Sequence, residues 1–436
     1  MIGEPGSIRN NENTPGGRAG PRVDRRSFLK ATGTGLAATG LAGCLGDDDD
    51  GTVTLGAMYI FSGFASLYGD EAERGFDLAV EEINENGGID GQDVEIIARD
   101  TEGDADTAIR QMTSLIEEDG VDGLFGLDSS GVAQAMAPQV EEQRVPLMVT
   151  HAATPFLTSP EGEHDNSVGN EWVFRNCNNL SIDMYGAAQV AAELNATEWA
   201  TIGPDYAFGY ETWDYFQAYL EGLGADAEFT EEQYPGLETS DFTPYISSVI
   251  GAEPDGVITP LWGADLTTFL GQADEAGWFD EIEYTLFSVG MGTDLPADGS
   301  PLPEGQHAST RYDPFVPESE ENETFRETYY EEYDTLPTYN AEGAYRAVYL
   351  YKDAIEGDEN DPEAIRDTFT GMEHSGPVGE YRFDEETNQA VVPAIWGAVS
   401  QDEEWESNVL DPVDVYDVTS DELDDLLADS ELPSGV

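Results

Sequence analysis

Basic residues are scarce in this chain of 436 residues: 17 Lys and Arg stand against 91 Asp and Glu, and the formal net charge is −74. A chain this negative repels phosphate backbones, so binding to nucleic acid is excluded. In about molar salt the Debye length falls to about 3 Å, and the repulsion within the chain is largely screened. The acidity therefore indicates a halophilic protein that folds in brine, and the alternative is an ordinary acidic secreted protein.

Cysteine and histidine are also rare. The cysteines are Cys44 and Cys177, and because the first is expected to carry a lipid, no intrachain disulfide or cysteine metal cluster is predicted. The four histidines lack metal-ligand spacing: His151, His164, His307 and His374. There is no G-x-S-x-G elbow, no P-loop and no G-x-G-x-x-G after the first apolar run. We therefore expect no catalytic residue, no metal and no cofactor, and a protein that is not an enzyme.

The N-terminal segment carries the basic residues that the body lacks. Arg25 and Arg26 precede a weakly apolar run of small residues that ends in Leu41-Ala42-Gly43-Cys44. The run is too short and too rich in glycine for a membrane span, and it predicts a twin-arginine export signal with a lipobox over residues 1–43. Cys44 would become the lipid-anchored start of an extracellular chain on the outer face of the cell membrane, followed by an acidic linker over 44–52. An uncleaved tethering helix is the alternative and gives the same location.

Short apolar runs alternate with amphipathic stretches along the body of the chain. The first series predicts strands at 53–60, 94–98, 121–126 and 145–150, and helices at 70–84, 104–118 and 132–142. The second predicts strands at 199–203, 225–229, 256–259 and 284–289, and helices at 182–194, 211–223, 242–250 and 266–276. This alternation predicts an α/β protein with two doubly wound parallel sheets, each covered on both faces. Two helices, at 321–333 and 341–355, and a strand-like region at 378–399 follow, and we expect the acidic tail at 419–436 to be frayed.

Ligands of open parallel sheets bind beyond the carboxyl ends of the strands, so the strand-to-helix loops carry the candidate site. Ser129 and Ser130 can donate to an anionic group there, or one of them can cap a helix. In the adjacent loop, residues Ala152, Ala153 and Thr154 can surround the same group, or form a turn that ends at a proline. Four aromatic side chains can form the walls of the pocket, or pack in the core: Tyr68, Tyr206, Phe208 and Trp262.

These loops together resemble a known family. Six segments carry the resemblance: Ser62-Gly63 through Tyr68-Gly69, Gly75 through Gly91, Gly126-Leu-Asp-Ser-Ser-Gly131, Ala152-Ala153-Thr154-Pro155, Asp205-Tyr-Ala-Phe-Gly209 and Asp241-Phe242-Thr243. They are similar to the leucine/isoleucine/valine-binding family, the type I periplasmic-type solute-binding proteins of ABC importers. The resemblance covers roughly residues 53–400. It implies two lobes, joined by a three-segment hinge, that close on a solute.

The resemblance also implies boundaries and roles. The first lobe would comprise 53–175 plus 306–375, and the second 176–305 plus 376–418. Three groups would hold a ligand carboxylate: a serine at the position of Ser129 or Ser130, the backbone of Ala152, and Thr154. Tyr68 would line the ligand side chain, with an aromatic near Phe208 from the second lobe.

By the same resemblance, the chain would be a monomer that captures a small solute and delivers it to permease subunits with their ATPases. One departure bears on the solute. The family's amino-acid binders place an acidic residue for the ligand ammonium in the loop that corresponds to 290–294 here. In this chain Asp294, Asp265 or Asp205 would have to bind the ligand ammonium. Relatives with a different sequence in this loop bind amides, urea or aromatic carboxylates. The solute therefore stays open, as does a sensor role without transport.

Overall fold

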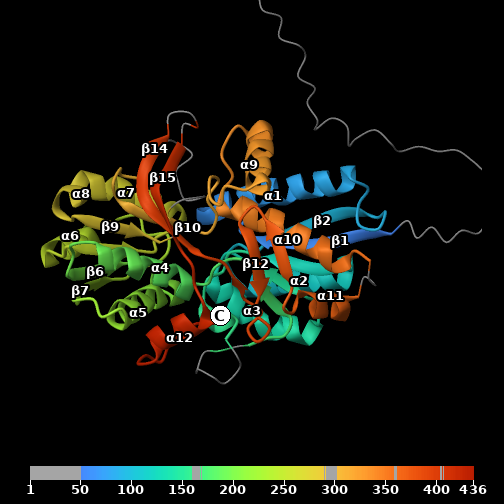
Figure 1. Cartoon of the computed structure of the whole chain (residues 1–436), viewed down its shortest axis with the longest axis horizontal. Helices are drawn as coiled ribbons and strands as arrows, with labels where there is room; N and C mark the ends of the chain where they lie inside the picture. Colours follow the sequence, from blue (N-terminus) through green and yellow to red (C-terminus); the bar gives the residue numbers. More distant parts are fainter. Residues whose placement is uncertain are drawn as a thin grey trace, which may run out of the picture. The chain divides into compact units, whose positions relative to one another are not determined.

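Two sheets with mainly parallel strands organise the part of the chain that the computed structural model describes (Figure 1). That part is residues 51–436 except 160–166, 168, 289, 291–301, 358–360, 403, 404 and 406. The predicted export signal with Arg25 and Arg26, the lipidation site Cys44 and the candidate acid Asp294 lie outside the described residues. Within them, no helix has both the length and the apolar character that a membrane span requires.

The first sheet has the strand order β2-β1-β3-β4-β5, and all its pairs are parallel. Its strands are β1 (Thr52–Tyr59), β2 (Asp93–Asp100), β3 (Gly123–Gly126), β4 (Leu147–Val149) and β5 (Val173–Arg175). Successive side chains of β1 enter opposite cores, with Tyr59 on one face and Met58 on the other. One core contains α1 (Ser66–Glu85), α10 (Tyr339–Ile355) and α11 (Pro362–Phe369), and the other contains α2 (Ala105–Ser114) and α3 (Ser130–Gln143).

The second sheet has the order β15-β14-β10-β9-β8-β6-β7. Five strands are parallel, and two at one edge are antiparallel. The parallel strands are β6 (Glu198–Ile202), β7 (Glu228–Gln233), β8 (Gly256–Thr259), β9 (Tyr284–Phe287) and β10 (His307–Thr310), and the antiparallel ones are β14 (Ala394–Asp402) and β15 (Ser407–Tyr416). The helices around it are α4 (Leu180–Glu193), α5 (Ala207–Gly222), α6 (Thr243–Ala252), α7 (Gly263–Ala276) and α8 (Trp278–Glu281). Both sheets are thus covered on two faces, and the predicted α/β class with two doubly wound sheets is confirmed.

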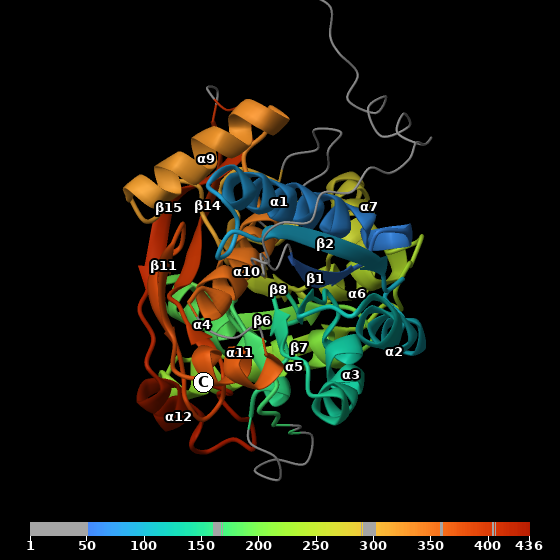
Figure 2. The same ribbon diagram turned by 90° about the vertical axis from the view of Figure 1, so that its right-hand side faces the viewer.

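Close backbone packing fixes α10 on the first sheet. Helices α1 and α10 lie side by side in both views (Figures 1 and 2). At their crossing, a Cβ atom at Gly75 would lie 1.9 Å from the carbonyl oxygen of Ala341, so only glycine allows the two helices this approach. The later helix is thereby joined to the core that the first helix builds, although more than 250 residues separate them in the sequence.

Two of the expected lobe boundaries need correction. Strand β10 was expected in the first lobe, but it lies between β9 and β14 in the second sheet, where both neighbours satisfy its backbone groups. A three-stranded sheet of β11 (Glu373–Gly376), β12 (Gly379–Phe383) and β13 (Ala390–Val391) was expected mainly in the second lobe. Its side chains Tyr381, Phe383 and Ala390 instead enter the core of the first sheet. The chain therefore crosses between the sheets near 176–179, 311–312 and 392–393.

The expectation of a frayed C-terminal tail is wrong. Residues Ser420–Leu427 form α12, which packs on α4 and α5, and residues 433–436 are buried. Side chains distant in the sequence hold this end of the chain. The Tyr215 hydroxyl donates to the carbonyl of Pro433 at 2.5 Å, Asn179 Nδ2 to that of Ser434 at 2.8 Å, and Thr158 Oγ1 to that of Gly435 at 3.0 Å.

Candidate functional site

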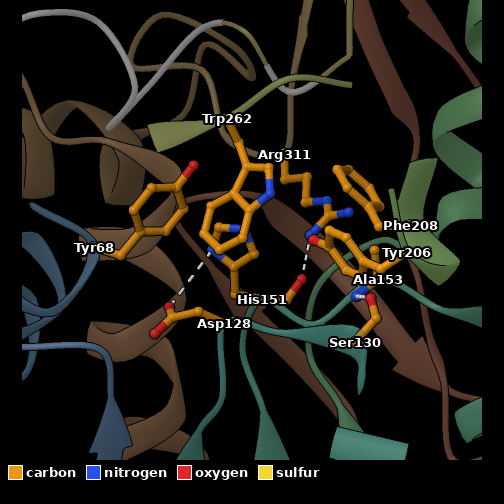
Figure 3. A pocket seen from close by; sticks show the side chains of 9 residues that line it. All are labelled: Tyr68, Asp128, Ser130, His151, Ala153, Tyr206, Phe208, Trp262 and Arg311. Carbon is orange, nitrogen blue, oxygen red and sulfur yellow. Dashed lines mark hydrogen bonds and ion pairs between the residues drawn. The ribbon is translucent and has the colours of Figure 1, made fainter. Parts of the chain in front are cut away.

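One pocket gathers the loops at the carboxyl ends of strands from both sheets (Figure 3). The first sheet contributes residues that follow β1, β3 and β4, and the second contributes the starts of α5 and α7 and the residue after β10. Nine residues line the pocket: Tyr68, Asp128, Ser130, His151, Ala153, Tyr206, Phe208, Trp262 and Arg311. The position agrees with the rule that open parallel sheets bind ligands at this edge.

Ser130 supplies a hydroxyl group on the first-sheet side of the pocket. It is the first residue of α3, and its Oγ accepts hydrogen bonds from the backbone N–H groups of Ala153 and Thr154, both at 3.2 Å. Since the oxygen acts as acceptor in both contacts, the hydroxyl hydrogen can be donated to a third group. The preceding Ser129 occupies the cap position of α3 but makes no capping hydrogen bond with its side chain.

Asp128 places a buried carboxyl group in the pocket wall. Its Oδ2 accepts from the backbone N–H of Ile60 at 2.7 Å, whereas its Oδ1 has no hydrogen-bond partner. Burial raises the pKa of Asp128 to about 7, the charge of Asp100 raises it further, and the Ile60 hydrogen bond opposes the shift. The free oxygen lies 3.9 Å from Nδ1 of His151.

His151 is a neutral neighbour of this carboxyl group. Burial lowers the pKa of His151 to about 3, the charge of Arg311 lowers it too, and the contact with Asn340 opposes both. Nδ1 of the ring faces Oδ1 of Asn340 at hydrogen-bond distance. Because an amide oxygen only accepts, the proton of the neutral ring lies on Nδ1. His151 therefore brings no positive charge to Asp128 at neutral pH.

Arg311 is the cation in the lining, and its charge is already compensated. Its Nε and Nη2 donate to Oδ2 of Asp183 at 3.1 and 2.6 Å, and its Nη1 donates to the carbonyl oxygen of His151 at 2.5 Å. Both side chains of the ion pair are 2 % exposed. The charge of Asp183 raises the pKa of Arg311 despite burial, which opposes it, so the guanidinium stays charged. The pair joins the residue after β10 to α4 and to the loop after β4.

Aromatic rings from both sheets face one another across the pocket. The rings of Tyr68 and Trp262 meet edge to face at 5.3 Å, and Tyr68 lies 4.8 Å from the ring of His151. Behind them, Phe64 packs on Trp262 at 4.8 Å. On the second-sheet side, Tyr206 and Phe208 lie 6.3 Å apart. The pocket thus has mostly apolar walls with a few polar groups, the composition typical of small-molecule sites.

A comparison with protein families identifies the chain: the family model described as periplasmic binding protein matches residues 52–404. The chain belongs to this family. The match confirms the resemblance drawn from the loops, and it spans both sheets of this periplasmic binding protein.

Curated relatives match about half of this periplasmic binding protein. Leu/Ile/Val-binding protein homolog 7 of Brucella suis biovar 1 is 29% identical over 229 residues, which are 52% of this chain and 56% of the relative. The chemotactic signal transduction system substrate-binding protein BasB of Halobacterium salinarum is 31% identical over 244 residues, which are 53% of this chain and 52% of the relative. The matched regions thus span about half the length of these relatives.

Solved structures share the fold over most of the chain. A solute binding protein of an ABC transporter from Rhodopseudomonas palustris BisB5, solved with 3,4-dihydroxy benzoic acid, has a TM-score of 0.74 at 22% identity and covers 85% of this chain and 98% of that one. The branched-chain amino acid transporter substrate binding protein LivJ from Streptococcus pneumoniae, solved with isoleucine, has a TM-score of 0.72 at 20% identity. Its match covers 84% of this chain and 99% of that one.

The structure brings most of the expected site residues of this periplasmic binding protein together. Six of them line the pocket: Tyr68, Ser130, Ala153, Tyr206, Phe208 and Trp262. Ser129, Ala152 and Thr154 are absent from the lining. The N–H of Ala152 donates to Leu127 O at 2.9 Å, and the carbonyl groups of Ala152 and Thr154 both accept from Arg175 at 2.9 Å. The roles of all these residues in binding stay predictions.

Three lining residues were not expected from the sequence: Asp128, His151 and Arg311. Of the three acids considered for a ligand nitrogen, Asp294 lies outside the described residues and the other two are not in the lining: Asp205 is exposed, and Asp265 accepts from the backbone N–H of Glu238 at 3.0 Å. Among the described residues, no group of three or more His, Cys, Asp and Glu side chains could hold a metal ion.

Proposed function

We propose that this chain is the solute-binding component of an ABC importer, which captures a small organic solute between its two lobes and performs no chemistry on it. The solute would be an amino acid of the branched-chain type, or a related amide or small carboxylate. Lipid attached to Cys44 after twin-arginine export would hold the chain, as a monomer, on the outer face of the membrane beside its permease and ATPase subunits.

The observation that carries this proposal is the composition of the pocket lining. Tyr68 and Ser130 come from loops of the first sheet, whereas Phe208 and Trp262 come from loops of the second. A solute in contact with both sets stabilises the arrangement in which the two lobes approach each other. The names of the related proteins, which include Leu/Ile/Val-binding homologues and substrate-binding proteins of ABC transporters, support the same function.

A thermal-shift screen in about molar KCl tests this proposal. A solute at 100 times its Kd should add about 2.7 kcal/mol to the free energy of unfolding and raise the melting temperature accordingly. Replacing Trp262 by Ala should weaken binding at least about tenfold because the pocket loses an aromatic wall. Replacing Ser130 by Ala should weaken it by about 1–3 kcal/mol through loss of a hydrogen bond to the solute.

Trp405 offers the matched control for the tryptophan variant, because it lies outside the pocket lining and packs on Phe315 and Tyr330. Trp405→Ala should leave the affinity within about twofold of the original. Equal affinities of the Trp262→Ala protein and the unmodified protein, with both folded, would mean that this pocket is not the binding site.

A second candidate function is ligand sensing without transport, and the similarity to the chemotactic BasB protein favours it. Both functions require the same pocket, so a binding measurement does not separate them. Deletion of the gene separates them. If the protein is an importer component, deletion should abolish uptake of the labelled solute. If it is a sensor component, deletion should abolish movement toward the solute and leave uptake unchanged. Restoring the gene with Trp262→Ala should fail to rescue whichever response is lost.

A further inference from the structure

Asp128 has an acceptor atom in the pocket that the fold does not use. The carboxyl group is buried, its Oδ2 holds the end of β1 through Ile60 N–H, and its Oδ1 has no partner. A buried acceptor without a partner destabilises the fold, and more so when the group is charged. Holding Ile60 requires only one oxygen, so an Asn would serve equally well if the role of residue 128 were purely structural.

The described charges around this oxygen leave it without a counter-ion. His151, which lies 3.9 Å away, is neutral because burial and Arg311 lower its pKa to about 3. Arg311 is compensated by Asp183 at 2.6 Å. Asp100, on the neighbouring β2, adds a second negative charge and raises the pKa of Asp128 further. Asp128 is therefore a carboxyl group without a counter-ion that borders the pocket, and its side chain is 0 % exposed.

The aromatic rings on this side of the pocket suit a positive charge. Figure 3 shows the carboxyl group of Asp128 on the same side as the rings of Tyr68, His151 and Trp262. A cation near the face of a Trp or Tyr ring is stabilised by the negative charge density there, most strongly where water is excluded. Ser130 supplies a hydroxyl donor on the same wall. The lining thus offers an acceptor with aromatic neighbours for a cationic N–H group, and a separate donor for an oxygen.

We propose that Asp128 is the specificity-determining residue of the pocket, and that it selects solutes with a protonated nitrogen over nitrogen-free acids of the same shape. This inference rests on the proposed function. It places the recognition of nitrogen in the first lobe, on the second residue after β3, whereas the family resemblance predicts an acid in the 290–294 loop of the second lobe. A nitrogen-free aromatic or aliphatic acid would place its carboxylate near a carboxyl group that has no counter-ion, and ionisation of either group would then disfavour ionisation of the other.

Matched pairs of solutes test this inference by calorimetry in about molar KCl. The pairs are leucine with 4-methylpentanoate and phenylalanine with 3-phenylpropanoate, and 4-hydroxybenzoate is added as an aromatic acid. Asp128→Asn keeps the acceptor for Ile60 and replaces the free oxygen by an NH₂ donor. We expect the unmodified protein to bind the amino acid of a pair at least tenfold more tightly than its nitrogen-free counterpart. Asp128→Asn should remove this difference, with the amino acid weakened at least tenfold and the acid unchanged or tighter.

Asp226→Asn is the matched control, since it removes the same charge from an exposed position outside the lining. It should leave all affinities within twofold, because exposed charges are screened in molar salt. Nitrogen-free acids that bind at least as tightly as the amino acids, with affinities that Asp128→Asn leaves unchanged, would overturn the inference while the proposed function stands. If no solute of either series binds the folded protein, the proposed function and the inference both fail.

Discussion

Replacing Arg311 by Met is expected to lower the free energy of unfolding by about 3–5 kcal/mol, since the variant leaves a buried charge without its partner. Asp183 is 2 % exposed and accepts two hydrogen bonds from the guanidinium. The substitution also removes the donor to the carbonyl oxygen of His151, which is 2.5 Å from Nη1. Urea unfolding in about molar KCl at pH 8 measures the loss.

A second ion pair provides the control for this experiment. Arg99 and Asp119 also meet at 2.6 Å, but their side chains are 29% and 26% exposed. Arg99→Met should cost at most about 1 kcal/mol, because water replaces the lost contact. In the Arg311→Met background, Asp183→Asn should recover at least half of the loss, since it removes the uncompensated charge. If the losses at Arg311 and Arg99 are equal, the buried pair does not stabilise the junction between the lobes.

The alternation of strands and helices could be predicted because each element shows its own apolar periodicity within a short stretch of sequence. Strands such as β1 and β8 are continuous apolar runs, and helices such as α1 repeat their apolar residues at three- and four-residue steps. The C-terminal tail could not be predicted in this way. Its sequence is acidic and indicates fraying, and its order depends on hydrogen bonds from Thr158, Asn179 and Tyr215, which lie more than 200 residues earlier.

The residues of the candidate site divide in the same way, into those that local sequence patterns predict and those that depend on contacts with distant residues. The aromatic residues Tyr68, Phe208 and Trp262 could be found because they follow predicted strands at the edge where ligands bind. Asp128 follows a predicted strand as well, but one acid among 91 Asp and Glu carries almost no information. Arg311 is one of only 17 basic residues, and this scarcity was the available signal. Its role depends on Asp183, which lies 128 residues away in the sequence.

The free energy of unfolding is expected to fall as the pH rises from about 5 to 8. Several buried or half-buried carboxyl groups have raised pKa values, mainly through burial, and four of them define the pH window. The pKa is about 7 for Asp128, Glu211 and Glu342, and about 6 for Asp313. Between the pKa of about 4 in the unfolded chain and these values, the folded state binds more protons than the unfolded state. Linkage then requires stability to decrease with pH across this window and to level off above about pH 8.

The upper limit of the expected decrease is roughly 10 kcal/mol, since the three groups near 7 each contribute over about two pH units above pH 5 and Asp313 over about one, at about 1.4 kcal/mol per pH unit. The lowered pKa values of Asp104 and Asp255, which arise from backbone hydrogen bonds, affect stability only below about pH 4 and do not contribute in this window. Urea unfolding at constant KCl, repeated across this pH range, measures the sum, and Asp128→Asn should reduce the slope. General repulsion among the surface carboxylates has the same sign, but it weakens with salt, whereas desolvation of buried groups does not. A slope that persists at several molar KCl therefore belongs to the buried carboxyls, and stability that is constant or rises between pH 5 and 8 would show that they do not control it.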